Sequence, residues 1–570
     1  MHGSDPSTNL QDYDPSSSIL IGPPLRDPLP SSWRLTDILY RASLVPGAKG
    51  VRFLNDDNSE EFLTYRQLLD LAQGVAKSLT RADENSTAQA IISTRSLRQF
   101  LIAFWACLSA GIVPVPCALP LEAESREWRN FASVLHRLDQ PLILTSRADF
   151  PILSALVRTL GDSSQIFDVD GLISAIQHDD KAPNSPVPIS PRTVDDVVFM
   201  LMTSGSSGVP KLVTHTHRTV KAYCAGASQY NNFSSDEVML NWLPLDHVGG
   251  LASIHLLSIW LACDQIQAPM ASVFAKPLRW IDWIDRYRAT VSWAPNFAFS
   301  LLNQYASEIE ERDWDLSCIN CIVNAGEPIV YAQAARFLKL LEKHKLRGNA
   351  MRPAWGMSET CSGAVFSDGL DLAHDAAEPR YVPVGTPRPG LALRIVTSEG
   401  QMLPQGRAGE LQVRGPCMTP GYYRNEAATA ESFSGDGWFR TGDTAVVEGG
   451  QLTIVGRSKH VIIINGCNYT GVEIEATVAK VPGVRPTCIV AVAMRGASAT
   501  TDRIGVALAI EDSYQSQQER VLREVRRTLM QAFHCSTPIL AVVEEIEIPR
   551  TSLGKVLHEE VRKMLARGAA

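Results

Sequence analysis

The sequence contains no long uninterrupted apolar run and no stretch rich in lysine and arginine. Its most apolar window, Phe100–Leu121, includes three prolines. We therefore predict a buried helix over about Leu97–Ala110, a turn, and a short strand over Ile112–Cys117, rather than a membrane span. The chain carries 53 Lys and Arg against 61 Asp and Glu, a formal net charge of -8. Nucleic-acid and anionic-membrane partners are therefore disfavoured, and small-molecule chemistry is favoured.

The sequence also lacks two further patterns: cysteines at the spacing of disulfide or zinc sites, and the features of a secretory signal. The 11 cysteines are scattered, and the one close pair, Cys318 and Cys321, has no second Cys or His pair at metal-ligand spacing. We predict reduced thiols rather than disulfides or a zinc site. The N-terminus has no basic region followed by an apolar core, so we expect no secretory signal and a cytoplasmic location.

The chain is long enough for more than one core, with 570 residues of which 45% are hydrophobic. Residues 1–32 are rich in Ser, Pro and Asp without periodicity, which predicts a flexible extension. Helical and strand-like segments then alternate, as in an α/β domain of mixed, mainly parallel sheets, which we place at residues 33–455. Short strand-like runs after Gly390 predict a β-rich lobe within this unit. Residues 461–570 form a small C-terminal α+β unit.

One stretch has the outline of a phosphate-binding loop. The apolar run Val197–Met202 predicts a buried strand, and Thr203-Ser204-Gly205-Ser206-Ser207-Gly208 and then Lys211 follow it. Glycines allow backbone N–H groups to converge on an anion, hydroxyls add donors, and Lys211 adds a positive charge.

Three later segments carry the residue types that a nucleotide needs. Arg352–Thr360 contains Trp355, whose face suits a purine, and Glu359, whose carboxylate suits Mg²⁺. Trp438–Asp443 is predicted to end in a turn whose carboxylate suits the hydroxyls of a ribose. Pro549–Lys555 places one lysine in a polar loop, where its charge suits an α-phosphate.

In this order and approximate spacing, the segments resemble the adenylate-forming superfamily: acyl-CoA synthetases, fatty acyl-AMP ligases, adenylation domains of peptide synthetases, and luciferases. The resemblance runs from about Phe62 to Leu557. Trp242–His247, Ala294–Phe299 and Asn324–Pro328 resemble the acyl-AMP ligases and acyl-loading adenylation domains most.

The resemblance implies a role for each matching residue. ATP phosphates would be bound by Thr203, Ser204, Gly205, Ser206, Ser207, Gly208 and Lys211. Adenine would be framed by Ala325, Gly326, Glu327, Trp355 and Gly356, and ribose would be bound by Asp443 and Arg457. Catalysis would use Glu359 as the Mg²⁺ ligand, Thr360 at the α-phosphate, and Lys555 between the carboxylate and the α-phosphate. The acyl pocket would be lined by His247, Val323, Ala325, Ala354 and Ser362.

The activity implied by the resemblance has two half-reactions, which use ATP, Mg²⁺ and a phosphopantetheine thiol. A carboxylic acid is activated to an acyl-adenylate with release of pyrophosphate, and the acyl group then passes to coenzyme A or a carrier protein. Family members swing the small C-terminal domain between the steps. The resemblance places the hinge at residues 456–460, with Lys459 at its centre, and leaves the chain as either a free-standing ligase or part of a longer synthase.

Other classes of protein fit less well. A P-loop NTPase needs G-x-x-x-x-G-K-[ST], but position 549 is Pro and Lys555 is followed by Val. A serine hydrolase needs G-x-S-x-G, which neither Ser-Gly segment provides. A non-catalytic adenylate-binding homologue is the alternative of a different class, although Glu359, Asp443 and Lys555 are all present.

The substrate is open at this stage. Amino-acid-activating relatives use an Asp after the loop to hold the substrate ammonium, and Leu245-Asp246-His247-Val248 can be aligned in two registers. The register that keeps Leu-Pro-Leu-x-His-x-x-Gly puts His247 at that place, which favours an aryl, α-keto or fatty acid over an amino acid. Two departures from the family are Trp355 in place of the more usual Tyr, and His460 where acyl-AMP ligases often carry Asp.

Overall fold

The structure is a computed structural model that describes residues 16–27, 33–57, 59–82, 89–138, 140–177, 193–203, 210–370, 372, 379, 381–457, 461–464, 467–495, 502–544, 547–551 and 556–568. Several predicted site residues lie outside these ranges, namely Ser204, Gly205, Ser206, Ser207, Gly208, Lys459 and Lys555. In the described part of the chain, no helix is long and apolar enough to span a membrane.

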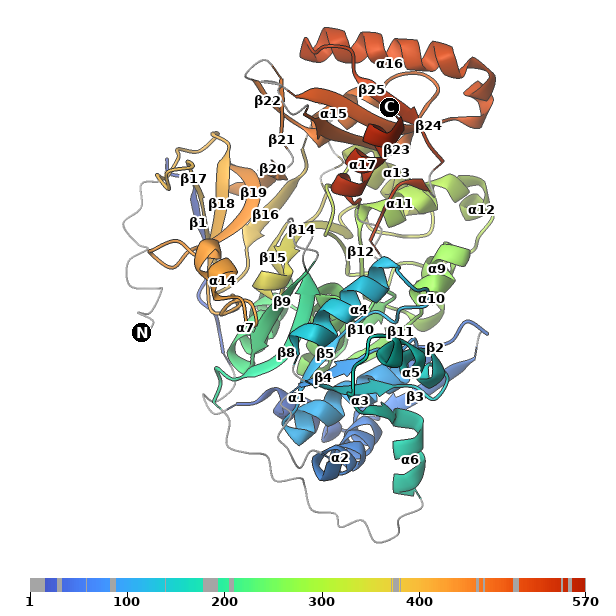
Figure 1. Ribbon diagram of the computed structural model, residues 1–570, viewed down its shortest axis with the longest axis vertical. Helices are drawn as coiled ribbons and strands as arrows, with labels where there is room; N and C mark the ends of the chain where they lie inside the picture. The colour runs from blue at the N-terminus through green and yellow to red at the C-terminus, as the bar shows by residue number, and fades with distance from the viewer. Residues whose placement is uncertain are drawn as a thin grey trace.

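Most strands belong to one 14-stranded sheet that crosses the molecule (Figure 1). In spatial order its strands are β1 (Ile19–Ile21), β17 (Ala392–Val396), β18 (Gly409–Arg414), β19 (Phe439–Glu448), β20 (Gln451–Arg457), β16 (Pro383–Pro387), β15 (Ser362–Phe366), β14 (Met351–Met357), β13 (Cys321–Asn324), β12 (Val291–Ala294), β10 (Val238–Asn241), β11 (Asp264–Gln267), β2 (Gly50–Leu54) and β3 (Glu60–Thr64).

The sheet changes from parallel to antiparallel at β14. The pairs from β2 through β11, β10, β12 and β13 to β14 are parallel, whereas β3 at one end and β15, β16 and the strands beyond them at the other pair antiparallel. The mainly parallel α/β class is confirmed. The predicted β-rich lobe is present, and the hydrogen bonds of β15 and β16 join it to the parallel strands in one continuous sheet.

A second, parallel sheet consists of β5 (Val113–Pro116), β4 (Gln89–Ile92), β6 (Leu142–Thr145) and β7 (Ile166–Asp168). The helix predicted over Leu97–Ala110 is confirmed as α3 with these bounds, and it ends at Gly111, whose φ of 78° suits glycine. Most side chains of α3 are apolar and buried, which is typical of a helix that lies inside a protein core.

The other helices cover these sheets (Figure 1). They are α1 (Leu35–Ser43), α2 (Tyr65–Ala82), α4 (Arg126–Arg137), α5 (Phe150–Thr159), α6 (Val169–Gln177), α7 (His217–Asn231), α8 (Leu257–Leu261), α9 (Met270–Ala275), α10 (Arg279–Tyr287), α11 (Asn296–Leu302), α12 (Ala306–Glu310), α13 (Tyr331–Glu342) and α14 (Glu426–Ser432). Short 3₁₀ turns η3 (Asn303–Tyr305) and η4 (Ser358–Thr360) and the π-helical segment η2 (Gly249–Leu256) complete this part.

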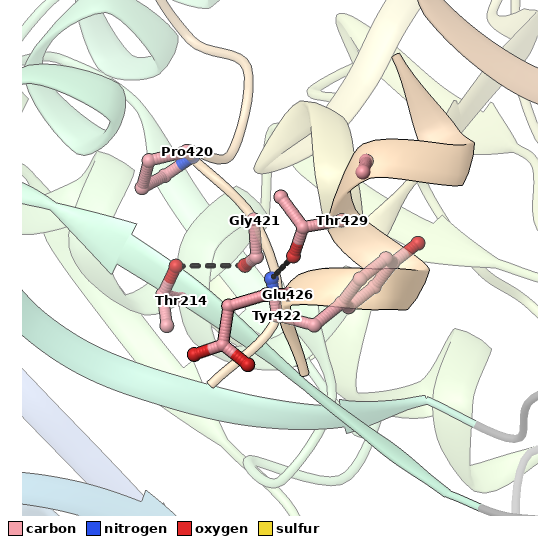
Figure 2. A pocket seen from close by; sticks show the side chains of 7 residues that line it. Thr214, Pro420, Gly421, Tyr422, Glu426 and Thr429 are labelled. Atoms are coloured by element: carbon pink, nitrogen blue, oxygen red, sulfur yellow. Dashed lines mark hydrogen bonds between the residues drawn. The ribbon is translucent and has the colours of Figure 1, made fainter. Parts of the chain in front are cut away.

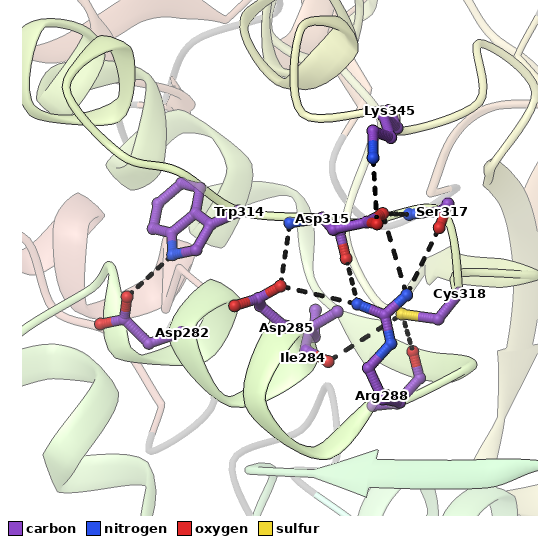
Figure 3. Close-up of polar contacts among 10 residues, drawn as sticks. Asp282, Ile284, Asp285, Arg288, Trp314, Asp315, Ser317, Cys318 and Lys345 are labelled. Atoms are coloured by element: carbon purple, nitrogen blue, oxygen red, sulfur yellow. Dashed lines mark hydrogen bonds and ion pairs between the residues drawn. The ribbon is translucent and has the colours of Figure 1, made fainter.

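A polar cluster behind β12 and β13 fixes the C-terminal end of α10 (Figure 3). Arg288 follows the helix with φ 55°, and its guanidinium donates to the carbonyl oxygen of Asp315 at 2.5 Å and to Ser317 Oγ at 3.3 Å. The Asp315 N–H donates to Asp285 Oδ1 at 2.8 Å, and Lys345 Nζ lies 3.1 Å from Asp315 Oδ2. Such contacts compensate the strain of a positive φ at a non-glycine residue.

Residues 461–568 build their own hydrophobic cores (Figure 1, top). They contain the hairpin β21 (Val461–Ile464) and β22 (Cys467–Thr470) and the sheet β23 (Val484–Met494), β24 (Arg503–Ile510) and β25 (Ile539–Val542). Helices α15 (Gly471–Val478), α16 (Gln518–Phe533) and α17 (His558–Gly568) and the 3₁₀ turn η6 (Asp512–Gln517) pack with them. The predicted boundaries of this unit and its mobility stay predictions.

The N-terminal segment corrects one expectation. We predicted a flexible extension over residues 1–32, yet β1 pairs antiparallel with β17. The N–H of Ser18 donates to the Leu403 carbonyl oxygen at 2.9 Å, and that of Gly22 donates to Leu391 at 2.7 Å. Composition missed this strand because β17 supplies unpaired edge groups that a short, otherwise weak strand can satisfy.

The structure of the segment Thr441–Asp443 also differs from our prediction. We predicted a turn there, but these residues lie inside β19, which is bulged opposite both neighbouring strands. Gly442 has φ 73°, a conformation that glycine adopts without strain. The turn-like composition therefore marks a β-bulge, which redirects the side chain of Asp443.

The pairing of β1 yields a stability prediction with a control in the next residue. Leu20 packs against the main core, whereas Ile21 is 47% exposed. We expect Leu20→Ala to destabilise the protein by about 1–2 kcal/mol and Ile21→Ala by less than about 0.5 kcal/mol. Urea unfolding followed by tryptophan fluorescence measures both. Equal effects would show that β1 contributes no packing.

Candidate active site

The strands that flank the predicted phosphate loop form a two-stranded sheet of their own. Strand β8 (Val197–Thr203) pairs antiparallel with β9 (Lys211–Thr216), and Thr203 lies opposite Lys211 at the end where the loop begins. The Nζ atom of Lys211 lies 4.5 Å from the ring centroid of Tyr422, a cation–π distance. Thr203 and Lys211 therefore lie side by side at the two ends of the predicted loop, and their role in binding phosphates stays a prediction.

Glu359 lies in η4, directly after β14, and is 6% exposed. Its Oε1 accepts a hydrogen bond of 2.8 Å from the Tyr422 hydroxyl. Burial raises the pKa of Glu359, while the bond from Tyr422 and the charges of Arg457 and Lys211 counteract this rise. The charges of two cations from different strands thus act on one buried carboxylate.

Main-chain bonds hold the segment 419–423 beside β9 (Figure 2). The N–H and the hydroxyl of Thr214 donate to the carbonyl oxygen of Gly421 at 3.1 and 2.8 Å, and the N–H of Tyr423 donates to Leu212 at 2.8 Å. The same segment borders an open pocket of about 360 Å³, lined by Thr214, Pro420, Gly421, Tyr422, Glu426, Thr429 and Ala430.

Asp443, Arg457 and Trp355 converge from three strands. Asp443 is 4% exposed, and its Oδ1 accepts from Arg457 Nε at 2.8 Å while its Oδ2 accepts from Trp355 Nε1 at 2.9 Å. Asp443 and Arg457 are also opposite partners in the pairing of β19 and β20. Each carboxylate oxygen keeps a free lone pair, so the group can still accept from a diol.

The predicted adenine frame follows β13. Ala325 is buried, and Gly326 has φ 90° with open space where a Cβ would lie. The side chain of Glu327 reaches α11, where its Oε2 accepts a hydrogen bond of 3.0 Å from the N–H of Phe297. At β14, a Cβ on Gly356 would lie 2.2 Å from the Ser362 carbonyl oxygen, so only glycine fits there. Ala325, Gly326 and Glu327 thus follow the carboxyl end of β13, and Gly356 lies near the carboxyl end of the neighbouring strand β14.

Thr360 is placed differently from its predicted role. Its side chain is fully buried, and Oγ1 accepts from the N–H of Met357 at 3.0 Å and donates to the carbonyl oxygens of Met357 and Ser362. The hydroxyl therefore closes the η4 turn in this conformation. Contact with a phosphate needs that turn to open, so the contact stays a prediction.

The predicted acyl-pocket residues Val323, Ala325, Ala354 and Ser362 are all buried, between 2% and 4% exposed. Ser362 Oγ lies 2.5 Å from Ser253 Oγ, which accepts from the Tyr223 hydroxyl at 2.9 Å. Sequence reasoning missed this chain of hydroxyls, since its members come from α7, η2 and β15. Ser362 has φ 112°, a strained value for a non-glycine residue.

His247 and Asp246, the two registers of the substrate position, precede η2. Gly249 N–H donates to His247 Nδ1 at 3.1 Å. The pKa of Asp246 is raised to about 6, mainly by loss of solvation and also by the charge of Glu127, against the opposing effect of N–H groups of Asp246 and Ala118. A π-helix such as η2 is rare and often marks a functional site.

Tyr422 is the main site residue that sequence reasoning missed. Its signal was weak: Pro420-Gly421-Tyr422-Tyr423 is a turn-like stretch with tyrosines, and a tyrosine alone predicts no partner. Only the fold brings it to Glu359, 63 positions away in the sequence.

The residues present fit a hard divalent cation that is shared with phosphates. Among the described residues, no group of three or more His, Cys, Asp and Glu side chains forms a ready-made metal site. Glu359 offers buried carboxylate oxygens, the ligand type that Mg²⁺ prefers, and Mg²⁺ commonly takes one or two carboxylates together with substrate phosphates. Glu359 would therefore hold Mg²⁺ only together with a nucleotide.

Comparisons with known proteins agree with this geometry. The chain is similar to the solved structure of McyG A-PCP complexed with phenylalanyl-adenylate, at 34% identity and a TM-score of 0.87 over 97% of this chain and 85% of that one. It is also similar to an adenylation domain of a keto acid-selecting module bound to keto acyl adenylate, at 31% identity and a TM-score of 0.75 over 92% and 100%.

Curated relatives include nonribosomal peptide synthetase acyN of Ascocoryne sarcoides, 28% identical over 94% of this chain, and atromentin synthetase of Tapinella panuoides, 27% identical over 94%. The chain spans 58% and 57% of their lengths.

The fold is that of an adenylation domain. The model of the AMP-binding enzyme family matches residues 46–423. The chain therefore belongs to the AMP-binding enzymes, and the resemblance to the adenylate-forming superfamily is confirmed.

The raised pKa of Asp246 predicts a pH-dependent stability. The folded state holds the Asp246 proton up to about pH 6, whereas an unfolded Asp loses it near pH 4, so ionisation of the buried group costs stability as pH rises from about 4 to 6. We expect Asp246→Asn to stabilise the protein by about 1–2 kcal/mol at pH 7.5 and by about half as much at pH 5. Urea unfolding at both pH values measures this difference.

The matched control is Asp236→Asn, because Asp236 is exposed. We expect this change to shift stability equally at both pH values. A constant effect of Asp246→Asn across this range would contradict the assignment.

Proposed function

We propose that the protein activates a carboxylic acid with Mg·ATP to an acyl-adenylate and passes the acyl group to a phosphopantetheine thiol. The observation that carries the proposal is the buried carboxylate of Glu359, which follows the end of the parallel strand β14 and is bonded to Tyr422 beside Lys211. Burial raises the pKa of this carboxylate, and the charges of Arg457 and Lys211 act against that rise. Strands of open α/β sheets bind ligands at their carboxyl ends. The family membership of the chain supports the same reaction.

In the first half-reaction, a carboxylate oxygen of the acid forms a bond to the α-phosphorus, and the bond from that phosphorus to the bridging oxygen of pyrophosphate breaks. Lys211 and the Ser/Gly loop would stabilise charge on the leaving pyrophosphate, and Lys555 would stabilise charge at the α-phosphate. Glu359 would hold Mg²⁺, which would supply positive charge to the phosphates. Asp443 accepts from the ribose hydroxyls and orients the nucleotide.

In the second half-reaction, the sulfur of a phosphopantetheine arm attacks the acyl carbon, AMP leaves, and the thiol proton passes to solvent. Movement of residues 461–570 about the hinge near Lys459 would remove Lys555 and admit the thiol. The curated relatives are longer than this chain, and one similar structure joins an adenylation domain to a carrier, A-PCP. We therefore favour a carrier protein over coenzyme A as acceptor.

For the acid, we favour an α-keto acid over aryl, fatty and amino acids. A similar solved domain is described as keto acid-selecting. Asp246, the group that would otherwise hold an ammonium, has its pKa raised to about 6, mainly by loss of solvation and also by the charge of Glu127. A partly protonated, buried carboxyl group holds an ammonium poorly. The hydroxyl of Ser362, in contrast, can donate to a carbonyl oxygen.

An acid panel tests this function. We expect ATP- and Mg²⁺-dependent release of pyrophosphate, with hydroxylamine as the trap, to be fastest with aryl or alkyl α-keto acids. The matching α-amino acids should react at least about tenfold more slowly, since they lack the carbonyl oxygen and add a charge. Reactions without Mg²⁺ serve as the control. Silence with all acids and no thermal shift with ATP would favour a non-catalytic adenylate-binding protein.

Lys555→Ala separates the half-reactions. We expect it to lower the rate of adenylation at least about a hundredfold, since it removes charge stabilisation at the α-phosphate. Thiol transfer from a preformed acyl-adenylate should stay within about twofold of the wild type. Lys563→Ala, on exposed α17, is the matched control for loss of a lysine in the same unit. Equal loss in both half-reactions would contradict the role of Lys555.

A further inference from the structure

We propose that Tyr422 is a positioning residue of this site: its hydroxyl orients the Glu359 carboxylate while its ring holds the Lys211 ammonium. Both contacts come from one side chain, which is 8% exposed. The inference rests on the proposed function, because it concerns the relative positions of two groups of that site, the Glu359 carboxylate and the Lys211 ammonium.

The hydroxyl contact fixes the carboxylate. A carboxylate only accepts hydrogen bonds, so the Tyr422 O–H must donate across the 2.8 Å to Glu359 Oε1. Bonds to a charged acceptor are stronger than neutral ones, and this bond lies in a buried place. With Oε1 engaged, rotation of the carboxylate plane is opposed, and Glu359 presents a defined face to a cation.

The ring contact fixes the ammonium. Lys211 Nζ lies over the Tyr422 ring at 4.5 Å from its centroid, within the range of a cation–π contact. Lysine has a long flexible side chain, and a ring face limits where the charge can lie. Lys211 lies at the end of the predicted phosphate loop. The Tyr422 side chain therefore contacts this end of the loop through its ring and Glu359 through its hydroxyl.

The backbone of Tyr422 is bonded to β9 on one side and to α14 on the other, which limits movement of its ring. Tyr422 forms a β-bridge with Val213 of β9, and its N–H donates to Thr429 Oγ1 at 3.0 Å (Figure 2). Gly421 has φ 148°, and a Cβ there would lie 2.5 Å from Thr429 Cγ2. The chain therefore approaches α14 closely, directly before Tyr422.

A tyrosine that only fills space would behave differently. Loss of its hydroxyl would change stability, but it would leave the response of the reaction to Mg²⁺ unchanged. A positioning tyrosine acts through Glu359, so its loss should change the Mg²⁺ dependence and the turnover while binding of the acid is unchanged. These two readouts separate the alternatives.

The test is Tyr422→Phe in the full chain, which removes the hydroxyl and keeps the ring beneath Lys211. We expect kcat for acid-dependent pyrophosphate release to fall about tenfold and the Mg²⁺ concentration for half-maximal rate to rise several-fold. KM for the acid should stay within about twofold, and the thermal midpoint within about 2 °C. Tyr422→Leu, which also removes the ring, should lower kcat further and raise KM for ATP.

Tyr423→Phe is the matched control, since it removes a neighbouring phenol that has no part in the site, and it should match the wild type. In a Glu359→Gln background, Tyr422→Phe should have little further effect, because both changes act on one contact. An unchanged kcat and Mg²⁺ dependence in Tyr422→Phe, with an active wild type, would overturn this inference. An inactive wild type with every acid would instead reject the proposed function.

Discussion

The main-chain bonds between residues 419–423 and β9 are the constraint on which the candidate site depends. They join a segment near the β-rich part of the sheet to the hairpin that carries the predicted phosphate loop. The Thr419 N–H also donates to the carbonyl oxygen of Glu359 at 2.8 Å, so the same segment anchors the η4 turn. Backbone groups supply these bonds, and few substitutions can remove them without breaking the chain's local path. These bonds fix the relative positions of Lys211 and Glu359, which lie 148 positions apart in the sequence.

Buried charge in the site is matched by donors from several strands. Asp443 is paired with Arg457 across β19 and β20, and the Trp355 N–H satisfies its second oxygen. This explains the departure of Trp355 from the tyrosine that is usual in the family. An indole N–H only donates, so it can satisfy a carboxylate without competing for its acceptors, and its larger face still suits a purine. Asp246 has only main-chain N–H donors and no cation among the causes that act on its pKa, which is raised to about 6.

The sequence predicted those parts of the structure whose signals are local. The strand, turn and helix around Gly111, the parallel α/β class, and the motif residues Glu359 and Asp443 were of this kind, because periodicity, turn chemistry and spacing report on neighbours in the chain. Contacts between distant segments could not be predicted. Strand β1 forms only because β17 offers an open edge, and Tyr422 matters only because the fold places it against Glu359. The bulge at Gly442 was misread as a turn, since both conformations favour the same residue types.

The surroundings of Arg388 connect the fold to the choice of substrate. This residue is 1% exposed, and its Nε and Nη1 donate to the carbonyl oxygens of Gly363 and Ala222 at 2.9 Å. Its guanidinium also lies over the Tyr223 ring, 4.9 Å from the centroid. Gly363 follows Ser362 directly, so a fixed positive charge lies behind the hydroxyl chain of the predicted acyl pocket. Like charges repel strongly where water is excluded. This charge supports the proposed preference for an acid without an ammonium group, and that preference stays part of the proposal.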